Sequence, residues 1–412
     1  MFSHWLTTGL HSEQSAQQSK KFYEGFMSRE WQDNIAYAQA FRRMLHTQPE
    51  LAWHEHNTAA AIRTQLDELA ITWRKCANTG TVAWINPQLP GPAIALRGDI
   101  DALPIAEETG KEWQSQVSGC MHACGHDGHT ATLLAAARWL KRYEKHVPRK
   151  IVLLFQPAEE GGHGAREMIA DGALDDVEEI YGWHNWPALP YGVLACPDGV
   201  VMCGNGTFQI KLHGRGGHAS QPELCADPVL AASAITLALQ QICSRRLSPQ
   251  KAAVISVTNL QALGAPTVIP EYAELSGSIR VPDEDTRTQI TRWITEVAEC
   301  TAQAYGVTCT VEQVKRYGAT INHAQQAGRA REIWQSLYGP AAMNVAHSLP
   351  IMASEDFSYY LREKPGAFAL IGSHEGSGPV HACHSPHYDF NDKLINDVCR
   401  WFCRLSGMRN PP

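Results

Sequence analysis

The chain has 412 residues, of which 44% are hydrophobic and 19% are charged, and its formal net charge is −7. This composition excludes a mainly disordered chain, and the length predicts two or three domains, or one domain with a large insertion. The acidic balance, with no Lys/Arg run longer than a pair, excludes nucleic acid as an expected partner.

The N-terminus, "MFSHWLTTGLHSEQSAQQSKKF", lacks the charged start and long apolar stretch of a signal peptide. No uncharged apolar window of about 18 residues occurs, so we expect no membrane span and no membrane partner. Twelve cysteines without a CxxC pair are typical of reduced thiols. We therefore predict a cytoplasmic protein with a flexible N-terminal extension over 1–25.

The first elements of the chain alternate between helices and strands. Apolar residues at helical spacing predict two helices, which begin near Trp31 and Thr58. Short apolar runs bounded by Gly and Pro predict three strands, with a helix between the last two, at 81–86, 93–101 and 151–156. This alternation indicates a largely parallel α/β sheet that is covered by helices on both faces.

The pattern changes after Pro197 to the order β-α-β-β-α-β, which is typical of a small independent unit. Its predicted elements are a strand, a helix, two strands, a helix and a strand, at 206–212, 227–245, 252–263, 272–281, 284–305 and 307–314. The α/β pattern then resumes, with a helix, a strand and a closing helix, at 330–338, at 367–373 and from about Asn391. We predict a discontinuous α/β domain, 1–202 and 315–412, interrupted by an inserted domain, 203–314.

Polar motifs lie beside the predicted strands, where the loops of such a sheet gather. They include "GDID", "CGHDGH", "QPAEEGGHG", "GWHNWP" after the strand-like "EEIY", and "HACHSPHYDF". Taken singly, each has a structural explanation: Asp127, for example, is suited to cap a helix that begins near Gly128. Their shared placement at one rim of the sheet instead favours a metal centre.

The residue types in these motifs suit a metal centre and a hydrolytic reaction. Thiolate, imidazole and carboxylate groups bind Zn²⁺ and similar ions, and a thiolate or carboxylate can bridge two ions. Cys124 and His126 are two residues apart, so both can face one ion from a tight turn. Glu159 and Glu160 cannot point the same way on an extended segment, so one can bind metal while the other is a general base.

Six motifs in order carry a resemblance to a known family: "MHACGHDGHT", "FQPAEEGGHGAREMIADGAL", "GWHNWP", "GRGGHASQP", "ASEDFSYYL" and "HSPHYDFND". From about residue 31 the chain resembles the amidohydrolase branch of the di-metal aminoacylase and carboxypeptidase family. That branch includes hippurate hydrolases, auxin-conjugate amidohydrolases and N-acetyl-diaminopimelate deacetylases. The resemblance implies a di-metal peptidase-like catalytic domain, an inserted lid that commonly dimerises, and hydrolysis of the amide bond of N-acyl amino acids or related conjugates.

The resemblance also implies a ligand set and a catalytic base. Cys124 would bridge two divalent ions (Zn, Mn, Co or Ni), and the other ligands would be His126, Glu160, His184 and His384. Glu159 would take a proton from a metal-activated water and pass it to the leaving amine. Asp101 would orient a metal-binding histidine.

Three residues of the inserted domain match positions that act on the substrate in the family. His218 matches a histidine that stabilises the developing oxyanion, often across the dimer. Arg280 matches a position associated with the substrate carboxylate. Thr267 stands where the family commonly has Asn, and because a hydroxyl offers one donor rather than two, recognition of the usual amino-acid carboxylate is in question. We expect a small N-acyl substrate and a homodimer formed through the lid.

Several alternatives stay open at this point. Relatives with His-x-Asp at the position of Asp99 use that histidine as a ligand, so we expect His126 to replace it here and Asp99 not to bind metal. His381 and His387 lie three residues on either side of His384 and are alternative last ligands. We interpret the remaining nearby residues as supporting or structural: Cys120, His122, His129 and His163.

Two other functions compete with hydrolysis. The first is a noncatalytic metabolite-binding protein on the same scaffold, and only Thr267 favours it. The second is a thiol redox protein that uses Cys120 and Cys124, but their CxxxC spacing is unusual and this function leaves the glutamates and distant histidines unexplained.

Overall fold

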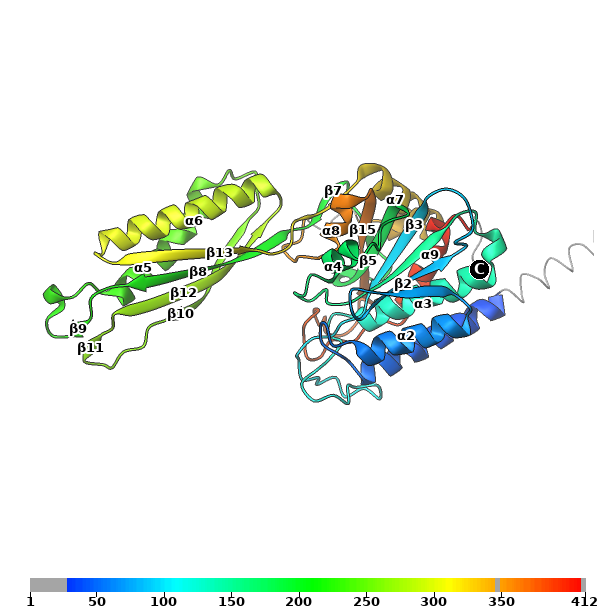
Figure 1. The fold of residues 1–412 in the computed structure, drawn as a ribbon, viewed down its shortest axis with the longest axis horizontal. Coiled ribbons are helices and arrows are strands. Elements are labelled where there is room, and N and C mark those ends of the chain that lie inside the picture. Colours follow the sequence, from blue (N-terminus) through cyan, green and yellow to red (C-terminus); the bar gives the residue numbers. More distant parts are fainter. Residues whose placement is uncertain (1–27, 345–348, 409–412) are drawn as a thin grey trace, which may run out of the picture. The chain divides into compact units, whose positions relative to one another are not determined.

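The structure is a computed structural model, and it describes residues 28–344 and 349–408. They divide into two units (Figure 1). The first unit contains 28–196, 325–344 and 364–408, and the second contains 197–324 and 349–363. The inserted domain predicted at 203–314 falls within the second unit, and the extension predicted at 1–25 lies outside the described residues.

The first unit is built on a seven-stranded sheet. In spatial order its strands are β1 (Thr72–Cys76), β2 (Gly80–Ile85), β4 (Ile151–Gln156), β3 (Ala93–Asp99), β5 (Val177–Pro190), β15 (Gly366–His374) and β6 (Leu194–Ala195). The four central strands, β4, β3, β5 and β15, run parallel, whereas β1, β2 and β6 join antiparallel at the edges. The predicted largely parallel sheet is therefore a mixed sheet with a parallel centre.

The central strands are buried because helices cover the sheet. Every residue of β3 and of β4 is buried. The helices of this unit are an unlabelled one at 28–47, then α2 (His56–Glu68), α3 (His126–Arg142), α4 (Gly164–Ala170), α7 (Ala324–Tyr338) and α9 (Lys393–Leu405). Short 3-10 turns occupy Glu144–His146 and Pro340–Ala342. Two helices precede the first strand, as the periodicity predicted.

The closing helix α9 illustrates how sequence periodicity produces the packing. Leu394, Val398, Trp401 and Leu405 recur at helical spacing, and all four side chains are fully buried in the core. Burying an aliphatic or aromatic side chain of this size stabilises a fold by about 1.5–3 kcal/mol. Packing of α9 against α3 therefore helps to fix the helix that begins at the candidate metal ligands.

The second unit has the predicted β-α-β-β-α-β order. Its elements are β8 (Gly204–His213), α5 (Pro228–Gln241), β10 (Val254–Gln261), β12 (Tyr272–Val281), α6 (Glu284–Ala304) and β13 (Thr308–Lys315). The strands form an antiparallel sheet in the order β10-β12-β8-β13. Side chains alternate along β8 and β12, and the buried ones pack with residues of α5 and α6. The predicted fold class, a peptidase-like α/β domain with this insertion, is confirmed.

Smaller elements complete the second unit. Two short sheets pair β9 (Gly217–His218) with β11 (Val268–Ile269) and β7 (Gly199–Met202) with β14 (Thr320–Asn322). The remaining helical segments are Pro222–Leu224, a π-helical turn at Ile242–Arg246, and α8 (Ser358–Glu363). Among the described residues, no helix combines the length and apolar character that crossing a membrane requires.

Candidate metal centre

The turn that carries Cys124 and His126 is closed by a glycine in the left-handed region. Gly125 has φ of 89°, and a Cβ there would lie 2.5 Å from both Asn185 Nδ2 and Tyr388 Oη, so only glycine fits. Helix α3 starts immediately afterwards, at His126. The prediction that Asp127 caps a helix beginning near Gly128 is therefore wrong. The glycine turn starts the helix two residues earlier and makes His126 its first residue.

His126 presents one ring nitrogen toward the candidate ligands. Its Nδ1 lies 3.0 Å from the backbone oxygen of Asp101 and 3.2 Å from Asp101 Oδ1. A carbonyl oxygen only accepts, so Nδ1 must donate, and neutral His126 keeps its lone pair on Nε2. Within the described part of the chain, the buried Nε2 makes no hydrogen bond.

The charges around His126 favour a cation. Burial alone would lower the pKa of His126, but the negative charges of Asp99, Asp101 and Glu160 outweigh it and raise the pKa to about 10. The same field attracts a divalent metal ion, which would take the place of the proton on Nε2.

His184 joins Cys124 from the neighbouring strand. The sequence placed "GWHNWP" after a strand, but β5 continues to Pro190, so His184 lies inside the strand and is buried. This correction follows from pairing, because β15 continues the parallel ladder past His184 to Trp186. His184 Nδ1 lies 2.6 Å from the backbone oxygen of Asn185, and its Nε2 lies 3.3 Å from Cys124 Sγ.

Glu160 and His384 approach Cys124 from two further segments. His384 Nε2 is 3.0 Å from Glu160 Oε1. The backbone N–H of His384 donates to the oxygen of Ala123 at 2.7 Å, and His384 has a left-handed φ of 70°. Because this conformation is uncommon outside glycine, the surrounding contacts must hold it in place.

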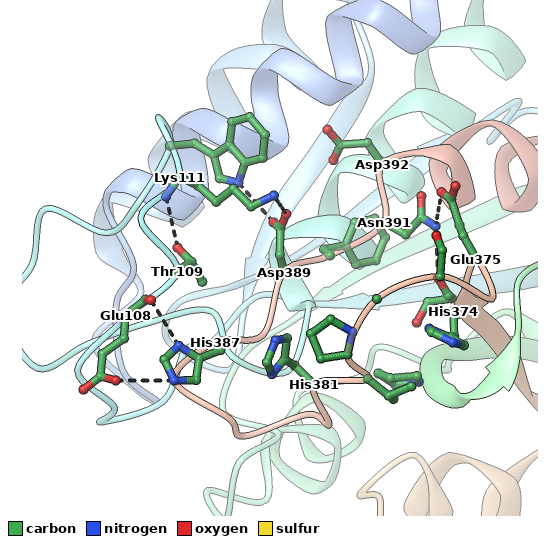
Figure 2. Close-up of a pocket in the computed structure, with 18 of the residues that line it drawn as sticks. Glu108, Thr109, Lys111, His374, Glu375, His381, His387, Asp389, Asn391 and Asp392 are labelled. Carbon is green, nitrogen blue, oxygen red and sulfur yellow. Dashed lines mark hydrogen bonds and ion pairs between the residues drawn. The ribbon is translucent and has the colours of Figure 1, made fainter.

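The two histidines on either side of His384 lie elsewhere. His381 and His387 contact each other and line a separate pocket of about 780 Å³ (Figure 2). His387 Nδ1 lies 3.1 Å from the backbone oxygen of Glu108, and its Nε2 is 3.5 Å from Glu108 Oε2. Of these three histidines, the structure therefore brings His384 to Glu160 and Cys124.

The candidate ligands form two groups that share one thiol. Cys124, His126 and His184 form the first group, and Cys124, Glu160 and His384 the second, with the ligand atoms of each group within 4.8 Å of one another. The pKa of Cys124 is raised by a hydrogen bond with Cys383, by burial, and by the charges of Glu160 and Glu159. A nearby cation reverses this preference and stabilises the thiolate. The residues therefore fit two divalent ions that share Cys124.

Two aspartates support the ligands. Asp101 Oδ2 accepts the backbone N–H of Glu160 at 2.9 Å. One carboxylate therefore contacts both His126 and the turn that carries Glu159 and Glu160, called the glutamate turn below. Asp99 accepts from Arg97 at 2.6 Å and pairs with His129 Nδ1 at 2.7 Å. Asp99, His126 and His129 also lie within 4.8 Å, but Arg97 already neutralises the Asp99 carboxylate, and His129 Nδ1 contacts its other oxygen. This arrangement supports the interpretation that Asp99 is not a ligand.

The three predicted substrate residues lie in the second unit. His218 is exposed, and its Nδ1 lies 2.7 Å from Ser220 Oγ. Thr267 is exposed, and its backbone oxygen accepts the N–H of Ala219 at 3.0 Å, which places Thr267 beside His218. Arg280 lies near the other end of β12, where it is half-buried and donates to Ser278 Oγ at 2.7 Å.

Sequence reasoning missed two buried charged residues behind the ligands. Arg42 is 2.8 Å from Asp392 Oδ1, 3.4 Å from Asp389 Oδ1 and 3.6 Å from Asp127 Oδ2. His46 Nδ1 lies 2.8 Å from Asp127 Oδ2. Both belong to the helix at 28–47, and no local pattern distinguishes them from charged residues on a solvated helix face.

Comparisons with known proteins show which proteins the chain resembles. The chain is 37% identical to the IAA-amino acid hydrolase ILR1-like 2 of Arabidopsis thaliana, over 86% of this chain and 81% of that protein. It is 38% identical to the N-acetyl-L-cysteine deacetylase of Bacillus subtilis, over 86% and 83% respectively. The structure of the Bacillus subtilis YXEP protein, a dinuclear metal-binding peptidase of the M20 family, aligns with a TM-score of 0.78 and 31% identity, over 91% of this chain and 98% of that one.

The match to a family profile extends over most of the chain. The profile of peptidase family M20/M25/M40 matches residues 95–406, which include all the candidate metal ligands. The two ligand groups that share Cys124 agree with a dinuclear centre. The resemblance predicted from the six motifs is confirmed, and the chain belongs to peptidase family M20/M25/M40, in its amidohydrolase branch.

Proposed function

We propose that this protein is a metal-dependent amidohydrolase that cleaves the amide bond of an N-acyl amino acid or a related conjugate. The observation that carries the proposal is the pair of ligand groups sharing Cys124, with Glu159 within 4.8 Å of ligand atoms of His126 and Glu160. The names of the relatives, an IAA-amino acid hydrolase and an N-acetyl-L-cysteine deacetylase, support an acyl group on an amino acid as the substrate class.

The metal ions would be held by the five residues of the two ligand groups: Cys124, His126, Glu160, His184 and His384. The mixed thiolate, imidazole and carboxylate set suits Zn²⁺, Mn²⁺, Co²⁺ or Ni²⁺. When bound, such ions supply Lewis acidity, which polarises a carbonyl group and makes water more acidic.

The protein's own residues then handle the protons. Glu159 is the general base: its carboxylate accepts a proton from the attacking water and delivers it to the leaving nitrogen. Asp101 holds His126 Nδ1 in its protonated form, which would leave the lone pair of Nε2 available to a bound metal ion. Asp101 also fixes the backbone of Glu160 through its N–H.

Substrate binding is proposed for Arg280, Thr267 and His218. Arg280 lies near one end of β12, and Tyr272 begins the other end, eight residues away. Tyr272 pairs with His213, and the chain continues from His213 to His218 in β9. At a rise of about 3.3 Å per residue this separates the two ends of the sheet by roughly 25 Å. One small substrate cannot span that distance. We therefore propose that Arg280 and His218 of one chain serve different active sites.

We propose that the second active site belongs to a partner chain, in a homodimer formed through the second unit. β10 is an edge strand of the four-stranded sheet, and most of its side chains are exposed. On α5, Leu230 and Leu237 are 55% and 76% exposed, which leaves an apolar stripe uncovered at helical spacing. An edge strand beside an apolar stripe is suited to self-complementary pairing in a two-fold dimer. These features support the dimer, with His218 donated to the partner's site.

All twelve cysteines are free thiols. Their lack of pairing supports a reducing compartment, and we propose that the protein acts in the cytoplasm.

The activity is tested with purified protein loaded with Zn²⁺, Mn²⁺, Co²⁺ or Ni²⁺ and a panel of acetyl, benzoyl and longer N-acyl amino acids. We expect hydrolysis of at least one member, and we expect Glu159→Ala to abolish it while two metal equivalents stay bound. A wild-type protein that binds no metal contradicts the mechanism. A fully metallated protein that binds these compounds without turnover favours the alternative function of a metabolite-binding protein.

The dimer is tested by co-expressing Glu159→Ala and His218→Ala chains. Each variant alone should be inactive. In random heterodimers, the chain that keeps Glu159 receives His218 from its partner, so roughly a quarter of wild-type activity should return. Absence of recovery in a sample shown to contain heterodimers contradicts donation of His218 across the dimer.

A further inference from the structure

The turn that carries Glu159 and Glu160 has a constrained backbone. Ala158 adopts φ of 53°, in the left-handed region that disfavours residues with a Cβ. The turn closes on itself, since Gly164 N–H donates to Ala158 O at 3.1 Å and a Cβ on Gly164 would lie 1.7 Å from the oxygen of Pro157. A non-glycine residue keeps such a conformation only when neighbouring groups impose it.

One neighbouring group is the carboxylate of Glu55. Glu55 is fully buried, and its Oε1 accepts the backbone N–H of Ala158 at 2.9 Å. Its Oε2 accepts from Thr79 Oγ1 at 2.6 Å, which fixes the carboxylate from the opposite side. Glu55 therefore contacts the residue of the turn that has the strained backbone.

Glu55 stands at the N-cap of α2, yet its side chain does not cap that helix. Glu50 does so instead: its Oε1 accepts the N–H of Asn57 at 3.0 Å and its Oε2 accepts the N–H of Thr58 at 2.8 Å. Because α2 is already capped, its stability does not account for the buried Glu55 carboxylate. The hydrogen bond to Ala158 in the glutamate turn gives the buried Glu55 carboxylate a role.

Two buried carboxylates thus bracket Glu159. Glu55 accepts the N–H of Ala158, and Asp101 accepts the N–H of Glu160 at 2.9 Å. The backbone on both sides of Glu159 is fixed, which limits the directions available to its side chain. We infer that Glu55 is a positioning residue, which holds Ala158 in its left-handed conformation and so presents Glu159 and Glu160 for catalysis and metal binding.

The inference rests on the proposed amidohydrolase function but concerns a residue that touches neither substrate nor metal. Burial and the nearby charge of Asp101 raise the pKa of Glu55 to about 7. In either protonation state one oxygen stays available to the N–H of Ala158. Glutamine preserves that acceptor, so Glu55→Gln is the conservative variant.

The test compares Glu55→Ala with Glu55→Gln in the metal-loaded enzyme. Loss of a group that orients metal-site residues costs about 10- to 100-fold in activity or metal affinity. We expect Glu55→Ala to lower kcat by at least about tenfold with little change in KM, and Glu55→Gln to restore most of it. Chelator competition should show weaker binding of at least one metal ion in Glu55→Ala, and this readout does not depend on turnover.

Two further variants separate positioning from general stability. Glu50→Ala removes the α2 cap and should lower the melting temperature without changing kcat. Introducing Ala158→Gly removes the need to enforce the left-handed backbone, so the loss of kcat caused by Glu55→Ala should be several-fold smaller in that background.

The outcomes distinguish this inference from the proposed function. If the wild-type enzyme hydrolyses no N-acyl amino acid, the proposed function is wrong, and the metal-binding readout still tests Glu55. The inference is overturned if Glu55→Ala keeps wild-type kcat and metal affinity, if Glu55→Gln is as impaired as Glu55→Ala, or if Ala158→Gly gives no relief.

Discussion

The two units hold their candidate functional residues in different ways. In the first unit, the metal-site residues come from separate segments and are fixed by contacts with one another, such as the buried pair of His126 with Asp101 and the partly exposed pair of His384 with Glu160. In the second unit, His218 and Thr267 are exposed, and the contacts around them are local. The first unit therefore holds its candidate ligands together within the fold, whereas the residues proposed to bind substrate in the second unit would gain further contacts only from a substrate or a second chain.

The largest effect should come from removing the thiol that both ligand groups share. We expect Cys124→Ala to lose metal from both groups, with a fall in turnover beyond the roughly 10- to 100-fold cost of changing supporting residues. Metal analysis and hydrolysis rates measure both. Cys120→Ala is the matched control: Cys120 is also buried, but its thiol donates to the oxygen of Pro49, so metal content should be unchanged. Equal metal loss in the two variants contradicts the shared-thiol site.

Next in size is the effect of the buried charge behind the ligands. Arg42 and Arg43 both lie 2.8 Å from Asp392, but the Arg42 side chain is 0% exposed and that of Arg43 is 44% exposed. Removing Arg42 takes the buried cation away from Asp127, Asp389 and Asp392, which each keep one other charged partner. Arg42→Met should therefore lower the free energy of unfolding by up to about 3–5 kcal/mol. Arg43→Met should cost about 0–1 kcal/mol. Denaturant titration of both variants measures this, and equal losses would show that burial does not set the difference.

Cys124 and Arg42 also show how far the sequence could predict the structure. Cys124, His126 and the glutamate pair stand in short motifs whose residue types reveal their chemistry. Arg42 stands in a helical run, and its partner Asp392 is 350 residues away, so local periodicity carries no information about the contact. Glu55 was missed for the same reason, because its partner Ala158 is 103 residues away.

Element boundaries failed where tertiary contacts override local signals. Strand β1, Thr72–Cys76, was not predicted because its sequence, "TWRKC", is mostly polar and only Cys76 is buried. In β5, the polar residues of "GWHNWP" suggested a loop, but parallel pairing with β15 extends the strand through His184. The motif already favoured His384 over His381 and His387, and the structure places His384 3.0 Å from Glu160. The backbone contact with Ala123 that holds His384 there is not visible in the spacing.

A smaller effect concerns the pH dependence of stability in the first unit. Burial would lower the pKa of His46, but the charge and hydrogen bond of Asp127 and the hydrogen bond to Glu107 raise it from 6.5 to about 9. A raised folded-state pKa stabilises the protein fully below pH 6.5 and loses that contribution as the pH rises through 9. The shift corresponds to about 3 kcal/mol.

We therefore expect the difference in unfolding free energy between wild type and His46→Gln to be larger at pH 6 than at pH 10. Denaturant titration at a series of pH values measures it. The same change at the exposed His146 is the control and should leave the pH dependence as in the wild type. A difference that grows with pH contradicts the proposed charge of His46.

The smallest effect should come from Thr267, an exposed residue of the second unit. Asparagine offers two donors where Thr267 offers one. A hydrogen bond contributes about 0.5–1.5 kcal/mol, so Thr267→Asn should lower KM for N-acyl amino acids by about two- to tenfold with kcat unchanged. Thr267→Val keeps the size but removes the hydroxyl, and it should raise KM. Steady-state kinetics on a free carboxylate substrate and its carboxamide distinguishes charge recognition from general contact.

The pattern across these substrates decides what Thr267 does. A lower KM for the carboxylate alone places Thr267 at the substrate carboxylate. Equal gains for carboxylate and carboxamide indicate contact with another part of the substrate. If neither Thr267→Asn nor Thr267→Val changes KM, Thr267 does not face the substrate. Recognition by the second unit must then depend on Arg280, whose guanidinium is already held by Ser278 before substrate binds.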